Sequence, residues 1–144
     1  MEKSEKTRKF LIATHGTFAA GVKSSLDIII GAIDHVFLIQ AYVDEAVSVE
    51  SQINEVMEQI GENDELVIFC DILGGSITNQ VLQHALRSNV HIVSGFNLPL
   101  LIEVLMADAE TPVEEVITSS IENAKEQMTY VNKLITVERE HPDD

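Results

Sequence analysis

One histidine and one aspartate each follow an apolar segment that is typical of a buried β-strand. His15 follows residues 10–14, and Asp71 follows residues 66–70. A carboxylate that binds one ring nitrogen of an imidazole fixes the tautomer, leaves the other lone pair free and stabilises the ring when it is positively charged. The pair therefore predicts nucleophilic or general-base chemistry, with His15 as the reacting group and Asp71 as its partner.

A glycine-rich segment, Gly74-Gly75-Ser76, comes shortly after Asp71. Glycines allow the backbone to approach a ligand closely, and free N–H groups at the start of a helix bind anions such as a phosphoryl group. The hydroxyl of Ser76 can cap that helix or donate to a phosphate. Taken alone, the glycine pair has a simpler explanation as a turn, and His15 has one as a polar loop residue. The functional interpretation therefore depends on whether the fold brings His15, Asp71 and this segment to the same place.

The elements that must position these residues alternate along the chain. Near-continuous apolar runs, which suit a parallel sheet covered on both faces, alternate with segments of helical period. This order predicts an α/β fold with an open, doubly wound, mostly parallel sheet of strand order 2-1-3-4. The predicted strands are residues 10–14, 35–41, 66–70 and 90–94.

Apolar residues three or four apart predict the helices between and after these strands. Ser48 is the expected N-cap of the second helix, and Pro112 opens the last one. Stripes facing the core are expected in the first helix at Ala19, Val22, Leu26, Ile29 and Ile30, and in the third helix at Ile77, Val81, Leu82, Ala85 and Leu86.

The topology brings the chemical groups together. In open α/β sheets, ligands bind beyond the carboxyl ends of the strands, where the strand order reverses. For order 2-1-3-4 this point lies between the strands that precede His15 and Asp71. Neighbouring strands are ~4.8 Å apart, so the two side chains can meet. The turn after His15 contains Gly16, which lets the chain pass close to the same point.

None of the other histidines is predicted to lie at the point where the strand order reverses. His35 and His91 open strands, His84 lies within a helix, and His141 lies near the C-terminus. No pair has the spacing of a metal site such as H-x-x-x-H, so we expect no metal and no other cofactor.

Composition narrows the class of protein. The 144 residues include 24 Asp and Glu against 9 Lys and Arg, for a formal net charge of −15. This charge repels phosphodiester backbones and anionic lipid surfaces, which argues against nucleic acid and membrane surfaces as partners. The single Cys70 excludes an internal disulfide and indicates a reducing compartment. The apolar runs are shorter than the ~20 residues of a membrane span, so we expect a cytoplasmic protein without membrane insertion.

We expect one domain over residues 10–137, with disordered polar tails at residues 1–9 and 138–144. Residues 129–137 leave two alternatives open. They follow the last helix without a Gly or Pro break, yet they are rich in residues that favour strands. The segment is either a continuing helix or a fifth strand added to the sheet of a partner.

Three motifs, in this order, resemble those of the mannose-type enzyme IIA proteins, components of the bacterial phosphoenolpyruvate-dependent sugar phosphotransferase system (PTS). The resemblance extends over about residues 10–137. Its motifs are Leu11-Ile12-Ala13-Thr14-His15-Gly16 with Ala19 and Gly21, Asp71-Ile72-Leu73-Gly74-Gly75-Ser76 with Asn79, and Gly95-Phe96-Asn97-Leu98-Pro99-Leu100-Leu101 with Glu103.

The resemblance implies a phosphoryl carrier. His15 would accept phosphate from phospho-HPr and pass it to enzyme IIB, a separate polypeptide through which the chain meets the membrane permease. Asp71 would bind His15, and the loop at Gly74, Gly75 and Ser76 would meet the phosphate. Supporting roles are expected from the motif residues Thr14, Gly16, Asn79 and Asn97.

The resemblance also implies a homodimer in which a C-terminal antiparallel strand crosses to the other subunit, which would account for residues 129–137. At Ile77 the sequence departs from the family pattern, where many relatives have proline. Proline preorganises the first turn of a helix, so the loop before Ile77 is less strongly fixed here.

Three other functions remain as alternatives. A receiver-like domain would be phosphorylated on Asp71, but it needs acids after the first strand to hold Mg²⁺, where this chain has Thr14-His15-Gly16. The phosphocarrier subunit of a dihydroxyacetone kinase shares the histidine and would serve a soluble acceptor. A non-catalytic interaction module on the same scaffold is the third.

Charge also suggests how partners dock. There is no Lys or Arg between residues 24 and 86, against 11 acids. Backbone amides must then provide most of the phosphate binding, and the partner is expected to supply positive charge.

Overall fold

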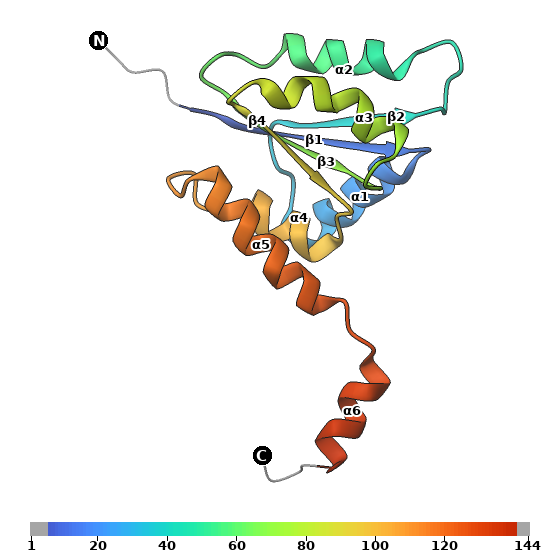
Figure 1. Cartoon of the computed structure of the whole chain (residues 1–144), viewed down its shortest axis with the longest axis vertical. Coiled ribbons are helices and arrows are strands. Elements are labelled where there is room, and N and C mark those ends of the chain that lie inside the picture. The colour runs from blue at the N-terminus through green and yellow to red at the C-terminus, as the bar shows by residue number, and fades with distance from the viewer. Residues whose placement is uncertain (1–5, 141–144) are drawn as a thin grey trace.

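The structure is a computed structural model that describes residues 6–140. Strands and helices alternate through most of the chain, as predicted (Figure 1). In chain order the elements are β1 (Arg8–His15), α1 (Phe18–Ile30), β2 (Val36–Ala41), α2 (Val49–Glu58), β3 (Glu65–Cys70), α3 (Ser76–Leu82), the 3₁₀ helix η1 (Gln83–Leu86), β4 (Val90–Ser94), α4 (Leu98–Leu105), α5 (Val113–Gln127) and α6 (Val131–Glu140).

The four strands form one parallel sheet in the order β2-β1-β3-β4, which confirms the predicted topology. β1 begins at Arg8, earlier than the predicted strand, because Arg8 pairs in register with Glu65 and also forms an ion pair with it at 3.4 Å. Residues 8 and 9 of the expected N-terminal tail therefore belong to the sheet. Residues 1–5 of that tail lie outside the described residues.

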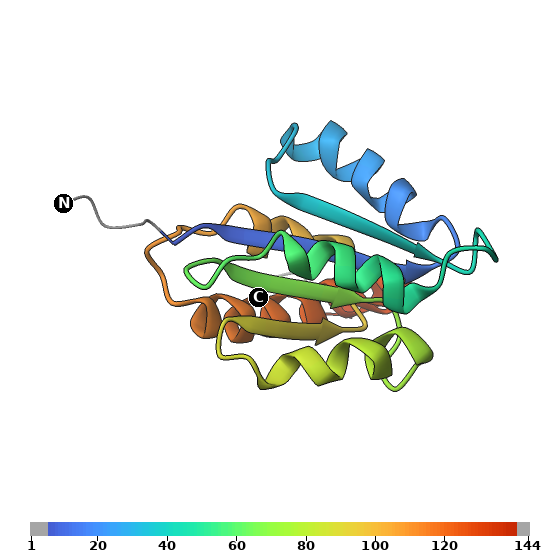
Figure 2. The same cartoon turned by 90° about the horizontal axis from the view of Figure 1, so that it is seen from above.

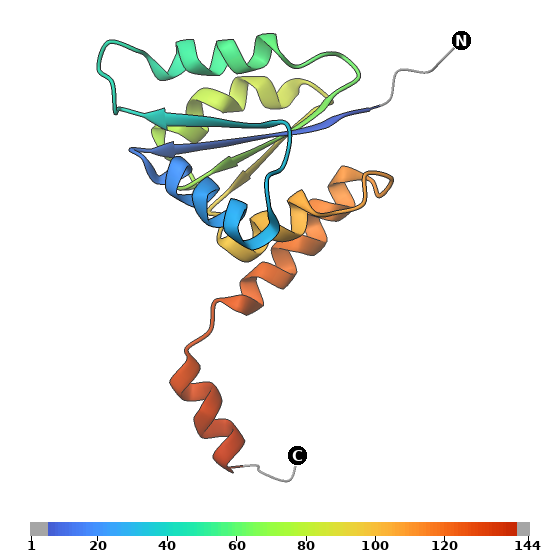
Figure 3. The ribbon, with the colours of Figure 1, turned by 180° about the vertical axis from the view of Figure 1, so that it is seen from behind.

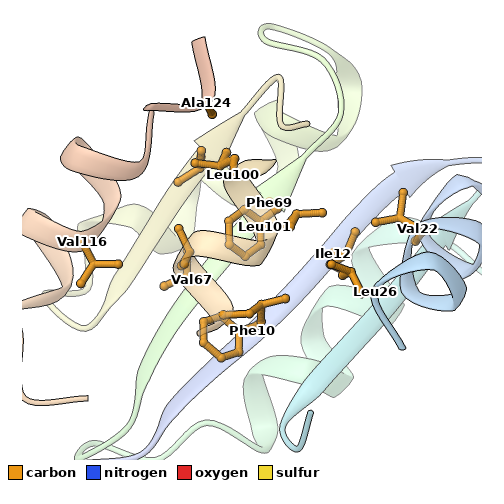
Figure 4. Packing of buried hydrophobic residues seen from close by; sticks show 14 of the residues in the cluster. Phe10, Ile12, Val22, Leu26, Val67, Phe69, Leu100, Leu101, Val116 and Ala124 are labelled. Atoms are coloured by element: carbon orange, nitrogen blue, oxygen red, sulfur yellow. The ribbon is translucent and has the colours of Figure 1, made fainter. Parts of the chain in front are cut away.

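Helices cover both faces of the sheet. α2 and α3 lie on one face, and α1, α4 and α5 lie on the other (Figures 1 and 2). Side chains of β1 alternate between two cores: Leu11 packs toward α2 and α3, whereas Phe10 and Ile12 pack toward α1 and α4 (Figure 4). This two-sided burial explains why the strands are apolar at nearly every position.

The expected apolar stripe of the third helix is wrong in its second half. Ile77 and Val81 are buried, but Leu82 and Leu86 are 51% and 93% exposed, and Ala85 is exposed as well. α3 ends at Leu82 and continues as a 3₁₀ helix, whose turn of three residues rotates later side chains away from the core. Ile29 of α1 is likewise exposed rather than buried.

In the single chain the C-terminal segment forms helix α6, which is the helical one of the two alternatives, and a strand exchanged with a partner is not shown within residues 6–140. Its first turn is closed by the carbonyl of Tyr130, which accepts from the N–H groups of Lys133 and Leu134 at 3.1 and 3.3 Å. The chain breaks direction at Met128, so α6 projects away from the α/β body (Figures 1 and 3). A segment without a sheet edge beside it satisfies its backbone locally, and a helix does this.

α6 includes residues 138–140 of the expected C-terminal tail, and residues 141–144 lie outside the described part. Across residues 6–140, no helix combines the length and the apolar character that crossing a bilayer requires.

Candidate active site

His15 and Asp71 meet at the carboxyl edge of the sheet. His15 is the last residue of β1, and Asp71 directly follows the neighbouring β3. Nδ1 of His15 lies 3.0 Å from Oδ2 and 3.2 Å from Oδ1 of Asp71, and the backbone N–H of His15 donates to Oδ2 at 3.0 Å. One carboxylate therefore holds both the main chain and the ring of the same histidine.

Asp71 is charged at neutral pH. Its side chain is 12% exposed, and this burial raises the pKa of the carboxyl. The hydrogen bonds from the backbone and ring of His15, together with the charge of that ring, lower the pKa by more, so it lies below the usual value of 3.8. Because an ionised carboxylate only accepts, Nδ1 of His15 must be the donor, and the lone pair of the neutral ring is on Nε2.

The loop after Asp71 passes beside the imidazole. Gly74 has φ +75°, a left-handed conformation that favours glycine, and Gly75 is the N-cap of α3. A Cβ atom on Gly75 would lie 3.7 Å from Cε1 of His15, so the loop backbone is close to the ring. The first N–H groups of a helix have no partner within it, so those at the start of α3 are available to a ligand.

A third strand contributes Tyr42, which the sequence analysis did not identify. Tyr42 follows β2, and its ring centroid lies 5.7 Å from that of His15 with an interplanar angle of 33°. Its hydroxyl is 2.6 Å from Oγ of Ser76. The available signal was its place in the predicted topology, since Tyr42 follows the strand that neighbours the strand of His15.

The sequence matches the family of PTS system fructose IIA components over residues 9–121, most of the chain. The chain belongs to this family. The mannose-type IIA component of the sugar PTS that the three motifs indicated is thereby confirmed.

Solved structures agree with this assignment. A proposed phosphoenolpyruvate-dependent sugar PTS permease from Klebsiella pneumoniae is 34% identical, with a TM-score of 0.87 over 94% of this chain and 98% of that one. The PTS IIA protein associated with the fucose utilization operon of Streptococcus pneumoniae is 27% identical, with a TM-score of 0.77 over 92% and 99%. A mannose/sorbose-specific IIA subunit from Enterococcus faecalis, 18% identical with a TM-score of 0.74 over 85% and 93%, shares the fold.

Two expected supporting residues shape the turn that carries His15 in this IIA component. Thr14 is fully buried, and its Oγ1 accepts from the backbone N–H of Ala19 at 2.8 Å, which ties β1 to the start of α1. Gly16 has φ +60°, and its N–H donates to the carbonyl of Ala41 at 2.9 Å. Both residues fix the backbone around His15.

The two asparagines of the motifs have different positions. Asn97 caps α4 through Oδ1, which accepts from the N–H of Leu100 at 3.0 Å, and its Nδ2 donates to the carbonyl of Ala124 at 3.1 Å. Asn97 therefore joins α4 to α5 and has a structural role. Asn79 is exposed on α3, one turn after Ser76, and within residues 6–140 its side chain makes no hydrogen bond.

The loop is anchored without the proline of many relatives. The side chain of Ile77 on α3 is buried in the core between the sheet and helices α2 and α3. Thr78, which the sequence analysis missed, donates from Oγ1 to the carbonyl of Ile72 at 2.8 Å. These two contacts hold the segment between Asp71 and α3 against the body of the protein.

Cations lie elsewhere in the part of the chain that the structure describes. There, no Lys or Arg forms a hydrogen bond or ion pair with His15, Asp71 or Ser76. Arg8 and Lys9 form ion pairs with Glu65 and Asp64 at the opposite end of the sheet. In the same residues, no cluster of three or more His, Cys, Asp and Glu is arranged to hold a metal ion.

Proposed function

We propose that this IIA component carries a phosphoryl group on Nε2 of His15. It receives the group from phospho-HPr and passes it to an enzyme IIB partner for sugar uptake and phosphorylation. The observation that supports this role is the pair of hydrogen bonds between Asp71 and His15. They involve the backbone N–H and Nδ1 of His15, and they leave Nε2 free on a side chain that is 38% exposed. This role implies the cytoplasm as its location, next to a permease that it reaches through enzyme IIB.

The chemistry is an exchange of one N–P bond for another. The lone pair of Nε2 attacks the phosphorus, and the bond to the donor histidine breaks with its electron pair returning to that nitrogen. The His15 ring gains positive charge as the new bond forms, and Asp71 stabilises this charge at Nδ1. Transfer to enzyme IIB is the same step with His15 as the leaving group.

Positioning and charge stabilisation account for most of the catalysis of phosphoryl transfer. β1 and the backbone bond from His15 to Asp71 fix the nucleophile. The free N–H groups at the start of α3 and the hydroxyl of Ser76 are suited to the negative phosphoryl oxygens. Residues 24–86, which include Asp71 and Ser76, contain no Lys or Arg. The phosphoryl donor and acceptor are therefore expected to bring the positive charge.

We also infer a homodimer that uses the C-terminal segment. Val131, Leu134 and Ile135 on α6 are each at least half exposed, so this helix has no apolar partner in the described chain. β4 is an open edge of the sheet where a strand from a second copy can pair. In the dimer, residues 129–137 would leave the helical form and add to that edge. Multi-angle light scattering tests this: a monomeric full chain contradicts it.

Intact mass spectrometry tests the carrier role. After incubation with phosphoenolpyruvate, enzyme I and HPr, we expect one phosphate on the wild type and none on His15→Ala. A matched control is His84→Ala, which changes a histidine outside the site and is expected to accept phosphate. The product should be labile in acid and stable in base, whereas the acyl phosphate of a receiver-like Asp71 is lost in base. Phosphate uptake by His15→Ala would overturn the proposal.

Partner assays separate the remaining alternatives. Phospho-His15 is expected to transfer its group to enzyme IIB and not to the catalytic subunit of a dihydroxyacetone kinase. A chain that accepts no phosphate from phospho-HPr would instead be an interaction module.

A further inference from the structure

We propose that Tyr42 binds the phosphoryl group on His15 through its phenol hydroxyl, which forms a hydrogen bond with the hydroxyl of Ser76 in the unphosphorylated protein. This inference rests on the proposed function, because it assigns a role at the same site. Tyr42 is not part of the three motifs, and it reaches the site from a different strand. It contacts the two groups that the reaction needs, the histidine ring and the serine hydroxyl.

The fold brings Tyr42 to this point. In the sheet, Ala41 lies opposite His15, so Tyr42 and Gly16 leave neighbouring strands at the same level. The N–H of Gly16 donates to the carbonyl of Ala41 at 2.9 Å, which joins the two turns. Tyr42 is thus held next to His15 by the main chain as well as by its own side chain.

The backbone of Tyr42 is in an unfavourable conformation. Its φ is +67°, in the left-handed region that bulky side chains rarely adopt. Strained residues persist where the surrounding structure requires them, and they cluster at functional sites. Here the strained backbone turns the ring toward His15 and brings the phenol within 2.6 Å of Ser76.

The paired hydroxyls can hold a phosphoryl group. In the unphosphorylated protein, Tyr42 and Ser76 bond to each other, with one hydroxyl donating and the other accepting. The ionised oxygens of a phosphoryl group only accept, so both hydroxyls can turn to donate to the phosphoryl group on Nε2. Hydrogen bonds to a charged group are stronger than the neutral bond that is lost, and the exchange favours the phosphorylated state.

The charge around Tyr42 makes such neutral donors useful. Tyr42 lines a hollow of about 490 Å³ together with Asp44, Glu45 and Glu50. The carboxylates that line this hollow repel a phosphoryl dianion. Within residues 6–140, no Lys or Arg forms a hydrogen bond or ion pair with His15, Asp71 or Ser76 that would offset this negative charge. The phenol of Tyr42 supplies a hydrogen-bond donor next to these acids without adding charge.

The test measures how the phosphoryl group distributes between HPr and the full-length protein at equilibrium. Tyr42→Phe keeps the ring and removes the hydroxyl, so we expect the equilibrium to shift about tenfold toward phospho-HPr. The ³¹P chemical shift of phospho-His15 should change in the same variant. A control is Ser24→Ala, which removes a hydroxyl from an exposed residue of α1 outside the site and should behave as wild type.

A second variant separates a role in transfer from a role in folding. Tyr42→Gly removes the ring but suits the left-handed backbone, so it should unfold at a temperature close to that of the wild type while shifting the equilibrium at least as far as Tyr42→Phe. A wild-type distribution and ³¹P shift in Tyr42→Phe would overturn the proposal. Failure of the wild type itself to accept phosphate from HPr would instead overturn the proposed function.

Discussion

Asp71 binds His15 at two points, accepting from its backbone N–H and from its ring nitrogen Nδ1, both at 3.0 Å. The first bond fixes the end of β1, and the second fixes the tautomer and direction of the imidazole. The position of His15 and the tautomer of its ring thus depend on one carboxylate. This relationship separates Asp71 from an acid that only caps a turn, because it couples the fold of the sheet edge to the chemistry of the histidine.

Loss of the Asp71 charge is expected to slow phosphoryl transfer. Asp71→Asn retains the size of the side chain, but it offers a single acceptor oxygen and no charge to the ring. We expect the rate of phosphate uptake from phospho-HPr to fall on the order of 100-fold, measured by rapid quench. Asp34→Asn is the matched control, since Asp34 is an exposed acid in the turn before β2. An unchanged rate in Asp71→Asn would remove Asp71 from the mechanism.

The lowered pKa of Asp71 makes its contribution to stability dependent on pH. A carboxyl whose pKa is lower in the folded than in the unfolded protein stabilises the fold at pH values above its unfolded pKa. This stabilisation is lost as the pH falls through the folded pKa, which here lies below 3.8. In urea unfolding, Asp71→Asn should be less stable than wild type at neutral pH, with a difference that shrinks below pH 3.8. A difference that stays constant through this range would contradict the assignment.

The two glycines of the site loop should respond differently to alanine. Gly74 has φ +75° with open space around it, so Gly74→Ala costs backbone strain of about 1 kcal/mol. Gly75 has φ −76°, which alanine adopts readily, and its nearest contacts would be ordinary at 3.6 and 3.7 Å. Urea unfolding is expected to show the loss for Gly74→Ala, with Gly75→Ala as the control. Equal effects in both variants would mean that the left-handed turn is not required.

The strand order and the position of the His15–Asp71 pair could be predicted from the sequence for a physical reason. Strands buried on both faces must be apolar throughout, so residues 66–70 and 90–94 stand out in the chain, and handedness rules leave few ways to connect them. Once the order is known, His15 and Asp71 must leave adjacent strands at the same edge. The pairing that the structure shows is a direct consequence of topology.

Other features depend on tertiary contacts that the sequence does not reveal. The position of Tyr42 requires a left-handed backbone at a bulky residue, which local preference opposes and which the bond to Ser76 accompanies. Residues 129–137 favour strands by composition, yet without a sheet edge beside them most of these residues belong to α6. Leu86 fits a helical stripe only while the helix continues, and the change to a 3₁₀ turn exposes it.

Cys70 should be an unreactive thiol in the native protein. It is fully buried at the end of β3, and burial raises the pKa of the thiol above its usual value. A hydrogen bond with the side chain of Thr78 lowers this pKa by a smaller amount, and the charge of Asp71 raises it further. Because the thiolate is the reactive form, a higher pKa and the lack of access both slow modification. We expect Ellman's reagent to label Cys70 in urea but not in native protein at mildly alkaline pH. Since Cys70 directly precedes Asp71, native labelling at the rate of a free thiol would show that the end of β3, and with it the His15–Asp71 pair, opens readily.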